Sequence, residues 1–443
     1  MKWRLFFSGA VALATTLGMS ATIPSEAAAR HHVAVAYPKF PKYTKHVTIT
    51  WWSWVSSANA LVKAFEKAYP TIKVIHRQIP GSEYTKLTTV LKAGSGAPDD
   101  VQIEYQMMPQ YVNTGDLVNL AQYDQQYMKW YPKWVQNQVT FGGKLFAMPE
   151  DVAPLGLLYN PSFFAKYHLS VPQTWAQFAA DAAKVHKANP KAYLSYFAPN
   201  DGGWITGLLW QAGAQPFLQM SNGAWKVDFT SPAAEQVMNF WGNLIKKGYV
   251  KVSNDFTPQW NHEVGSGLYG AFPAAAWSPK YQLQPALPKK YTPWKAAYIP
   301  QWKAGAHDDG NWGGSTTAVT NQTKHPRAAA LFAAWINLSE QGLSIGNNIG
   351  GYFTASTDSP HVAAFTAPVP VLGGQRANLI FEKESPWVNT SFEWSPWTLY
   401  VYSEMQVEFT KAASGKESWN QALANIQQNV SQFARTQGYQ VVQ

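Results

Sequence analysis

The stretch from Phe141 to Phe178 constrains the fold of this chain most, because two short extended runs follow each other across a break. Lys144–Met148 alternates as a strand does, and Pro149 is predicted to interrupt its ladder, since proline has no backbone N–H to donate. Leu155–Tyr159 resumes as a short apolar strand, and a turn and a new helical pattern follow it. We interpret the stretch as the exit from one domain and the entry into another.

A pattern of strand, helix and strand precedes this crossing stretch. Val47–Trp52 is rich in β-forming residues, a helical pattern stops at Pro70, and Ile72–Ile75 begins the next extended run. A second helical pattern leads to a third run at Val101–Glu104. Ligands of such parallel sheets lie beyond the carboxyl ends of the strands, so the residues where the first and third strands end should border one crevice. These residues are Trp52, Ser53, Trp54, Glu104, Tyr105 and Gln106.

A second α/β body follows the crossing stretch. Trp175–His186 is predicted to be a helix, and Leu268–Ala276 is a short apolar run that leads to Trp277. Trp312–Val319 is rich in glycine and threonine and is predicted as a second crossing strand. Arg327–Leu338 then has the pattern of a strongly amphipathic helix. We therefore expect the chain to cross between the two bodies more than once.

The first residues have the three-part pattern of a secretory signal. Basic residues precede an apolar run from Leu5 to Met19, and a small-residue cleavage site follows at Ala27–Ala29. The mature chain is therefore expected to begin near Arg30 and to be exported. No later stretch approaches the roughly 18 apolar residues that a membrane-spanning helix needs.

The composition excludes several kinds of site. The chain has no cysteine, which excludes disulfides, thiolate metal sites, cysteine nucleophiles and a lipid-modified cysteine at the cleavage point. Its 35 Lys and Arg exceed its 26 Asp and Glu, but they are spread along the chain, so we expect no nucleic-acid partner. A pI of about 9.3 with few carboxylates leads to the hypothesis that the protein lives in acidic surroundings outside the cell (an acidic exterior), because few ion pairs would be lost as the pH falls.

Several motifs together carry a resemblance to a known family. They are LKAGSGAPDDVQIEY with a later GDLVNL, GGKLFAMPEDVAPLGLLYNPSFF followed by PQTWAQF, LLWQAGAQPF and LYGAFPAAAW. In this order they resemble the extracellular solute-binding proteins of sugar-importing ABC transporters (extracellular solute-binding protein family 1, the maltose-binding-protein-like group), from about Val47 to the C-terminus. The resemblance implies an α/β, two-lobed periplasmic-binding-protein-like fold of type II, in which each lobe is a mostly parallel sheet flanked by helices and the hinge consists of crossing segments.

The resemblance also implies how the chain is divided and what it meets. The ligand would be a neutral mono- or oligosaccharide held in the cleft between the lobes, and the closed form would deliver it to the permease subunits of the transporter. A monomer without a cofactor is expected. The expected divisions are a signal peptide at 1–29, a basic flexible arm at 30–45, an N-terminal lobe at 46–152 and 314–370, and a C-terminal lobe at 153–313 and 371–443.

Sugars present apolar C–H faces and polar edges, so their sites need aromatic platforms and hydrogen-bond partners. Trp277 is the first candidate platform, because it ends an apolar run and matches the stacking tryptophan of the family. Among the carboxylates of the crossing stretch, Asp151 is preferred over Glu150 by family position. For each of these residues, packing in the core or a solvated turn is the alternative. Further candidates are Trp204 after the Asp201 turn, Trp312, Gly313 and Gly314 at the second crossing, and Tyr352 in the GGYFTAS loop.

Two other classes of function stay open. A secreted glycoside hydrolase would need two carboxylates across a sugar bond, and Glu104, Glu150, Asp151 and Asp308 are the candidates, although no hydrolytic motif surrounds them. The same fold with a polyol phosphate, a polyamine or a metal ion would need clustered Arg and Lys, several carboxylates, or His and Tyr ligands respectively. The 21 tryptophans favour a neutral sugar.

Overall fold

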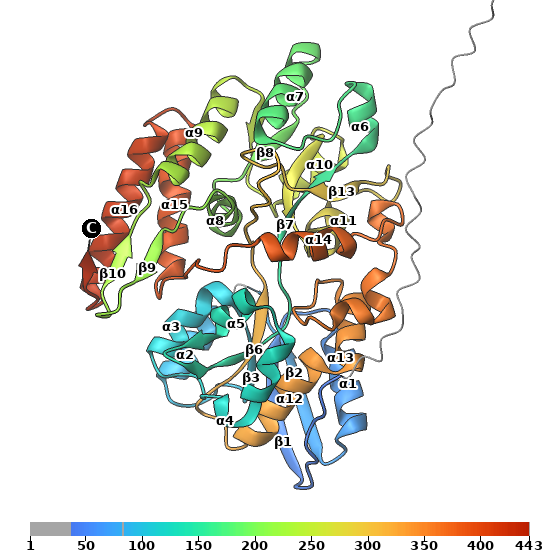
Figure 1. The fold of residues 1–443 in the computed structure, drawn as a ribbon, viewed down its shortest axis with the longest axis vertical. Helices are drawn as coiled ribbons and strands as arrows, with labels where there is room; N and C mark the ends of the chain where they lie inside the picture. The colour runs from blue at the N-terminus through green and yellow to red at the C-terminus, as the bar shows by residue number, and fades with distance from the viewer. Residues whose placement is uncertain (1–36, 82–83, 443) are drawn as a thin grey trace, which may run out of the picture. The chain divides into compact units, whose positions relative to one another are not determined.

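The computed structural model of the protein describes residues 37–81 and 84–442. The expected signal peptide and residues 30–36 of the expected arm lie outside the described residues. From Tyr37 onward the chain forms one compact unit. Within it, strands gather into separate sheets with helices packed against them (Figure 1).

The first sheet has the strand order β2-β1-β3-β14-β6. Its β1 (Val47–Ser53), β2 (Ile72–Gln78) and β3 (Asp100–Glu104) are parallel, as the sequence predicts. From far along the chain, β14 (Ser315–Val319) lies antiparallel between β3 and β6 (Ala147–Pro149). Because of this register the carboxyl end of β3 lies beside the first residue of β14.

The strand that was predicted to be interrupted at Pro149 does end at this residue, although Pro149 still pairs with β14. Pro149 is the last residue of β6 and lies opposite Thr316 of β14. The strand lies at the edge of the sheet, a position in which proline is tolerated because no further strand needs its missing backbone N–H.

Helices cover both faces of the first sheet. On one face Trp51 of β1 packs edge to face against Phe332, with ring centroids 5.2 Å apart, between α1 (Ala58–Ala68) and α12 (Pro326–Leu338). The prediction that this last helix is strongly amphipathic is wrong, because every residue from Ala328 to Leu338 is buried. It is enclosed by β1, β6 and β14 on one side and by neighbouring helices on the others.

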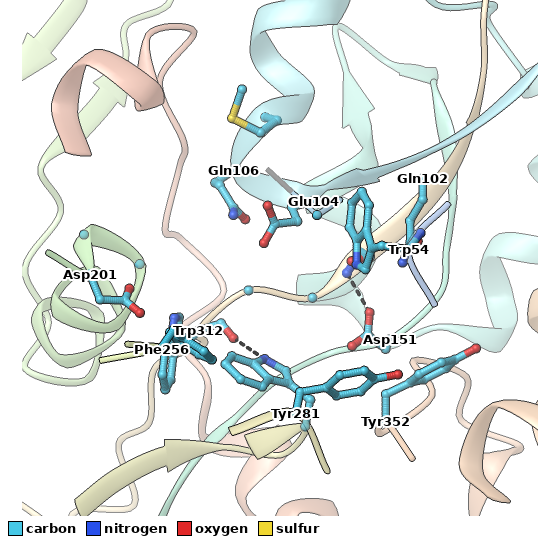
Figure 2. A pocket seen from close by; sticks show the side chains of 18 of the residues that line it. Trp54, Gln102, Glu104, Gln106, Asp151, Asp201, Phe256, Tyr281, Trp312 and Tyr352 are labelled. Carbon is cyan, nitrogen blue, oxygen red and sulfur yellow. Dashed lines mark hydrogen bonds between the residues drawn. The ribbon is translucent and has the colours of Figure 1, made fainter. Parts of the chain in front are cut away.

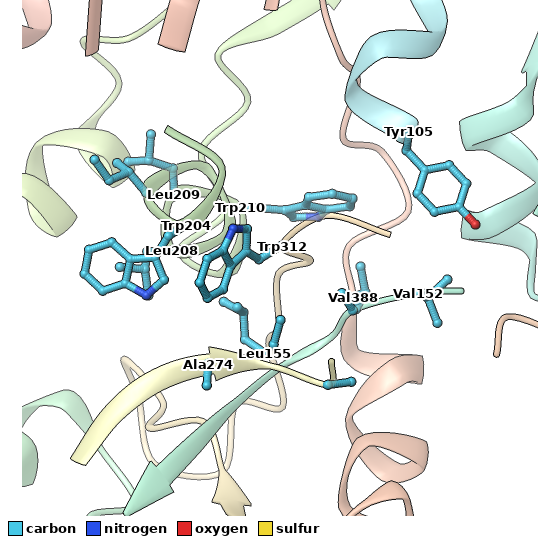
Figure 3. Close-up of a cluster of buried hydrophobic side chains, with 14 of the residues drawn as sticks. Tyr105, Val152, Leu155, Trp204, Leu208, Leu209, Trp210, Ala274, Trp312 and Val388 are labelled. Atoms are coloured by element: carbon cyan, nitrogen blue, oxygen red, sulfur yellow. The ribbon is translucent and has the colours of Figure 1, made fainter. Parts of the chain in front are cut away.

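The second body is built on a three-stranded antiparallel sheet of order β12-β7-β13. It consists of β7 (Leu155–Tyr159), β12 (Ala271–Ala275) and β13 (Lys295–Tyr298), with β8 (Ser195–Phe197) and β11 (Val250–Val252) as a parallel pair nearby. Against it lies a helical layer whose buried side chains meet those of the sheet, as Figure 3 shows around Leu155 and Trp204. This layer contains α7 (Trp175–Ala188), α8 (Gly202–Gln211), α9 (Pro232–Lys246), α15 (Thr398–Ala413) and α16 (Trp419–Thr436).

The chain passes between the two bodies at several places. Residues 150–154 connect β6 of the first sheet to β7 of the second, and a later segment returns from β13 to β14. After α13 (Glu340–Ile345), which packs on α1, the chain returns to α14 (Asn378–Glu384), which packs on β7 and β13. The division at 152/153, 313/314 and 370/371 stays a prediction.

Other elements complete the described part. Its other helices are α2 (Tyr84–Lys92), α3 (Met108–Asn113), α4 (Ala121–Asp124), α5 (Lys133–Val139), α6 (Pro161–Lys166), α10 (Pro258–Gly265) and α11 (Gln284–Ala286). Its other strands are β4 (Thr140–Phe141), β5 (Lys144–Leu145), β9 (Phe217–Gln219), β10 (Trp225–Val227) and β15 (Val441–Val442). Among the described helices, none has the length and apolar character that a bilayer crossing requires.

Residues 37–45 differ from the expected flexible arm, because they pack on the first body. Phe40 lies against Tyr127 with ring centroids 5.3 Å apart, and the Tyr127 hydroxyl donates a hydrogen bond of 3.2 Å to the Lys39 carbonyl. The Thr71 hydroxyl donates another of 2.9 Å to the Tyr43 carbonyl. The aromatic residues between the lysines supply the apolar surface that ties this segment down.

Candidate ligand-binding site

A cavity of about 510 Å³ lies where the two bodies meet. From the first body Glu104 and Gln106 reach it at the end of β3 (Figure 2). From the second body Trp277 reaches it just after the end of β12. The start of β14 closes the space between them, because Ser315 pairs with Glu104. The expectation of a crevice at strand ends therefore leads to this cavity, whose volume falls in the range of small-molecule sites.

Trp277 and Trp312 form an aromatic corner in the cavity. Their ring centroids are 4.6 Å apart with the planes inclined by 63°, and the Trp277 Nε1 donates a hydrogen bond of 2.9 Å to the Trp312 backbone oxygen. Gly313 makes the approach possible, because a Cβ there would lie 3.3 Å from that Nε1 and its φ of +81° disfavours other residues. The corner offers a rigid apolar surface to a ligand.

Phe256 extends this corner, and nothing in the sequence marks it. Its ring centroid lies 6.1 Å from that of Trp277 and 6.3 Å from that of Trp312, and 51% of the residue is exposed. Its φ of 54° is left-handed, a conformation that costs a bulky residue about 1–2 kcal/mol. The backbone N–H of Asp255 is tied to the Asn200 side chain at 3.2 Å, and Thr257 caps α10, so this strained geometry is held on both sides.

Among the described residues, five carboxyl groups line the same cavity, whereas no Lys, Arg or His does. Burial is the main cause that raises their pKa values: those of Glu104 and Asp151 to about 7 and that of Asp201 to about 6. Burial also raises the pKa values of Glu150 and Asp255 well above the ordinary range. The cavity is therefore acidic within a chain whose net charge is +9.

The protein itself holds Glu104 in position. The Tyr84 hydroxyl donates a hydrogen bond of 2.9 Å to its Oε2, and the Tyr84 oxygen in turn accepts one of 3.1 Å from the Glu104 backbone N–H. Gln106 interacts with the same carboxyl group and lowers its pKa slightly against the effect of burial. The Oε1 of Gln106 has no protein partner, although only 6% of the residue is exposed.

The crossing segment holds two further carboxyl groups. The Ser315 backbone N–H donates a hydrogen bond of 2.7 Å to Asp151 Oδ1, which fixes this residue beside β14. Glu150 Oε1 accepts one of 2.8 Å from Gln102 Nε2, and Gln102 Oε1 accepts one of 2.9 Å from the Trp54 backbone N–H. This chain of bonds connects the end of β1 to the crossing segment, and Gln102 was not among the predicted site residues.

Asp201 reaches the cavity, whereas the predicted Trp204 does not. Asp201 caps α8 by accepting a hydrogen bond of 2.7 Å from the Trp204 backbone N–H. The Trp204 ring is fully buried in the core, and its Nε1 donates to the Pro273 carbonyl at 3.1 Å (Figure 3). The prediction is corrected because the first turn of α8 turns Gly202 and Gly203 to the cavity and Trp204 to the core.

Three more predicted residues lie outside the cavity lining. Trp52 packs in the hydrophobic core, with the Arg77 guanidinium 5.2 Å from its ring centroid. Ser53 is buried, and its Oγ is 3.0 Å from the Nε2 of His76. Tyr105 is fully buried beneath Gly314. For Ser53 and Tyr105 the correction follows from alternation, because each neighbours a cavity residue, Trp54 or Glu104, whose side chain points the other way. Trp52 lies within β1, whereas Trp54 lies beyond its end.

The remaining candidates do line the cavity. Tyr352 lies there with 5% of its surface exposed, and beside it Tyr281 donates a hydrogen bond of 2.8 Å from its hydroxyl to the Gly350 carbonyl. Asp308 is absent from the lining. Within the described part of the chain, no group of three or more His, Asp or Glu is arranged to hold a metal ion. The predicted residues that line the cavity are Trp54, Glu104, Gln106, Asp151, Trp277, Trp312, Gly313, Gly314 and Tyr352.

Comparison with known proteins gives relatives of one kind. The arabinooligosaccharide-binding protein of Bacillus subtilis is 24% identical over 305 residues, which are 64% of this chain and 66% of that protein. The protein of the same name from Halalkalibacterium halodurans is 22% identical over 281 residues, 61% of each chain. The chain thus matches less than two thirds of the length of these relatives.

Solved structures share the fold. The galacto-N-biose-/lacto-N-biose I-binding protein from Bifidobacterium longum, in complex with lacto-N-biose, superposes with a TM-score of 0.79 at 23% identity, covering 90% of this chain and 100% of that one. The ABC transporter associated binding protein from B. animalis subsp. lactis, in complex with beta-1,6-galactobiose, gives 0.78 at 24% identity with the same coverage. Both have the type II periplasmic-binding-protein fold that the sequence predicts.

The family model described as bacterial extracellular solute-binding protein matches residues 51–342. This range contains most of the first sheet, the segments that connect β6 to β7 and β13 to β14, and nearly all of the cavity lining. Because it covers well over half of the chain, the protein belongs to the bacterial extracellular solute-binding proteins.

Proposed function

We propose that the protein captures a sugar, most simply an oligosaccharide, in this cavity and delivers it to the permease of an ABC importer. The observation that carries the proposal is the aromatic corner of Trp277, Trp312 and Phe256 in one cavity with carboxyl and amide oxygens. The C–H face of a pyranose ring packs on such a corner, while its hydroxyl groups donate to the oxygens.

The relatives support the same class of ligand. The two curated relatives are arabinooligosaccharide-binding proteins by name, and the two solved complexes contain disaccharides. Those ligands belong to the other proteins, but each is a neutral saccharide with several hydroxyl groups. The described lining of the present cavity disfavours a polyol phosphate, because it contains no Lys, Arg or His to pair with the phosphate.

The arrangement of the cavity supports delivery by closure. Groups from both bodies line it, so a sugar held by one body alone would leave half of its surface in water. We infer that the two bodies close on the sugar and that the permease recognises the closed form. The protein would act as an exported monomer, and no cysteine is available for a lipid anchor.

The experiment must distinguish sugar binding from glycoside hydrolysis, because several of the buried carboxyl groups have raised pKa values. The purified mature protein is titrated with a panel of neutral oligosaccharides by calorimetry, and each sugar is then analysed by mass spectrometry after long incubation. We expect saturable binding and an unchanged sugar. Cleavage above a boiled control, lost in Glu104→Gln or Asp151→Asn, would instead establish a hydrolase.

A further inference from the structure

The cavity has more hydrogen-bond acceptors than the protein itself satisfies. The Oε1 of Gln106 and the Oε2 of Glu150 are buried and have no hydrogen-bond partner among residues 37–81 and 84–442, and 6% and 2% of these residues are exposed. Figure 2 shows the side chains of Gln106 and Glu104 turned into the same space. A buried acceptor without a donor costs about 1–3 kcal/mol, so a ligand that supplies donors is favoured.

Three donor groups of the cavity lining are already engaged. The Tyr84 hydroxyl donates to Glu104, the Tyr281 hydroxyl to Gly350, and the Trp277 indole to Trp312. In the part of the lining that the structure describes, no lysine, arginine or histidine adds a positive charge. A hydroxyl group donates once, whereas an ammonium group donates three times and accepts nothing, which suits this surplus of acceptors.

One end of the cavity combines carboxyl groups with aromatic faces. Asp255 directly precedes Phe256 in the chain, and its carboxyl group interacts with that of Asp201, which also interacts with the Trp312 side chain. Trp277 and Trp312 meet at 63°, and Phe256 stands at 64° to Trp312, so the rings form inclined walls. Aromatic faces beside carboxylates are the surroundings in which proteins bind ammonium groups.

We propose that the preferred ligand is an amino-substituted saccharide, whose ammonium group lies between the Asp201 and Asp255 carboxyl groups and the rings of Phe256, Trp277 and Trp312. The inference rests on the proposed function and narrows its ligand from sugars in general to those that carry an ammonium group. A saccharide with a carboxylate or phosphate at the same place is excluded, because two anions would face each other without a cation between them.

The ligand test uses disaccharides of glucose and galactose with β-1,4 and β-1,6 linkages. Each is offered in a hydroxyl, a 2-amino, a 6-amino and a 6-carboxylate form, and binding is measured by calorimetry near pH 7. We expect an amino form to bind at least about tenfold more tightly than its hydroxyl parent and the carboxylate form not to bind. Equal or tighter binding of the hydroxyl parents overturns this inference and leaves sugar capture intact. Absence of binding by every form overturns both.

The variants locate the ammonium group. Asp255→Asn keeps the size of the side chain, and we expect it to remove the preference for the amino form, so that the amino form loses far more affinity than the hydroxyl parent. Glu104→Gln, at the end of β3, is the second variant in case the first fails to fold, and we expect a smaller loss of preference. Asp308→Asn removes an exposed carboxylate outside the cavity and is the matched control. A preference that survives both cavity variants overturns the proposed placement.

Discussion

The indole Nε1 of Trp277 donates a hydrogen bond of 2.9 Å to the backbone oxygen of Trp312. Trp277 follows β12 of the second body, and Trp312 directly precedes the glycine pair that leads into β14 of the first. The bond therefore ties the aromatic corner to a segment that crosses between the bodies. Any change in the angle between the bodies passes through this segment, so the position of the ring and the opening of the cavity are linked.

Trp277→Ala is expected to weaken sugar binding by about tenfold or more. An aromatic platform contributes roughly 0.5–1.5 kcal/mol beyond the area it buries, and the substitution also removes that area. Calorimetry with a sugar from the neutral panel measures the change. Trp387→Ala is the matched control, since Trp387 is partly buried and lies outside the cavity. An unchanged affinity in a Trp277→Ala protein with a native circular dichroism spectrum would show that this ring does not contact the ligand.

Phe256→Gly is expected to separate stability from binding. Glycine adopts a φ of 54° without the strain of about 1–2 kcal/mol that a bulky residue bears, so thermal stability should not fall. The loss of the ring should weaken sugar binding by about tenfold. His168→Gly is a matched control, because His168 has a φ of 50° and lies outside the cavity. Equal affinities in the two variants would contradict the role of Phe256.

The fold was largely predictable because its strands are short, apolar and separated by clear turn residues. Leu155–Tyr159 is β7 residue for residue, and the glycines at 313 and 314 do precede the crossing strand β14. The amphipathic pattern of Arg327–Leu338 was misleading, because periodicity cannot reveal that a helix is enclosed on all sides. Likewise the lysines within residues 39–45 led to the prediction of a flexible arm, although aromatic residues between them attach this segment to the first body.

The cavity was predictable only in part. The rule that ligands lie beyond strand ends located Trp54, Glu104 and Trp277, because strand ends are readable from sequence. It failed for Trp204, since the direction of a side chain in the first turn of a helix depends on how that helix packs. Phe256 was missed because a left-handed residue before a capping threonine leaves no periodic signal.

Trp204→Phe tests the correction that places this residue in the core. We expect a loss of stability on the order of 1–3 kcal/mol, because part of a fully buried side chain and its bond to the Pro273 carbonyl are removed. The affinity of the folded protein for sugar should stay within about twofold of the wild type. Urea unfolding and calorimetry measure the two quantities. A normal stability combined with a large loss of affinity would return Trp204 to the binding site.

The buried carboxyl groups of the cavity make the stability of the ligand-free protein depend on pH. Burial raises the pKa of Glu104 from 4.5 and that of Asp151 from 3.8, each to about 7. At pH values between the unfolded and the folded pKa of each group, the folded protein binds more protons than the unfolded chain, so its free energy of unfolding falls as the pH rises. The contribution is fully present below about pH 4 and is lost as the pH passes about 7.

The contribution of Glu263 to stability changes with pH in the opposite direction and limits the stability of the protein at low pH. Although burial opposes it, hydrogen bonds from Lys251 and Tyr269 lower the pKa of Glu263 to about 2, so its contribution to stability is lost only as the pH falls from about 4.5 towards 2. We therefore expect the ligand-free protein to be more stable near pH 5 than near pH 8, by a few kcal/mol at most, in urea unfolding across this range. Glu104→Gln should flatten the curve, whereas Asp308→Asn should leave it unchanged. A protein that gains stability from pH 5 to 8 would contradict this reading and, with it, the hypothesis of an acidic exterior, because its carboxyl groups would then be stabilising in their ionised form.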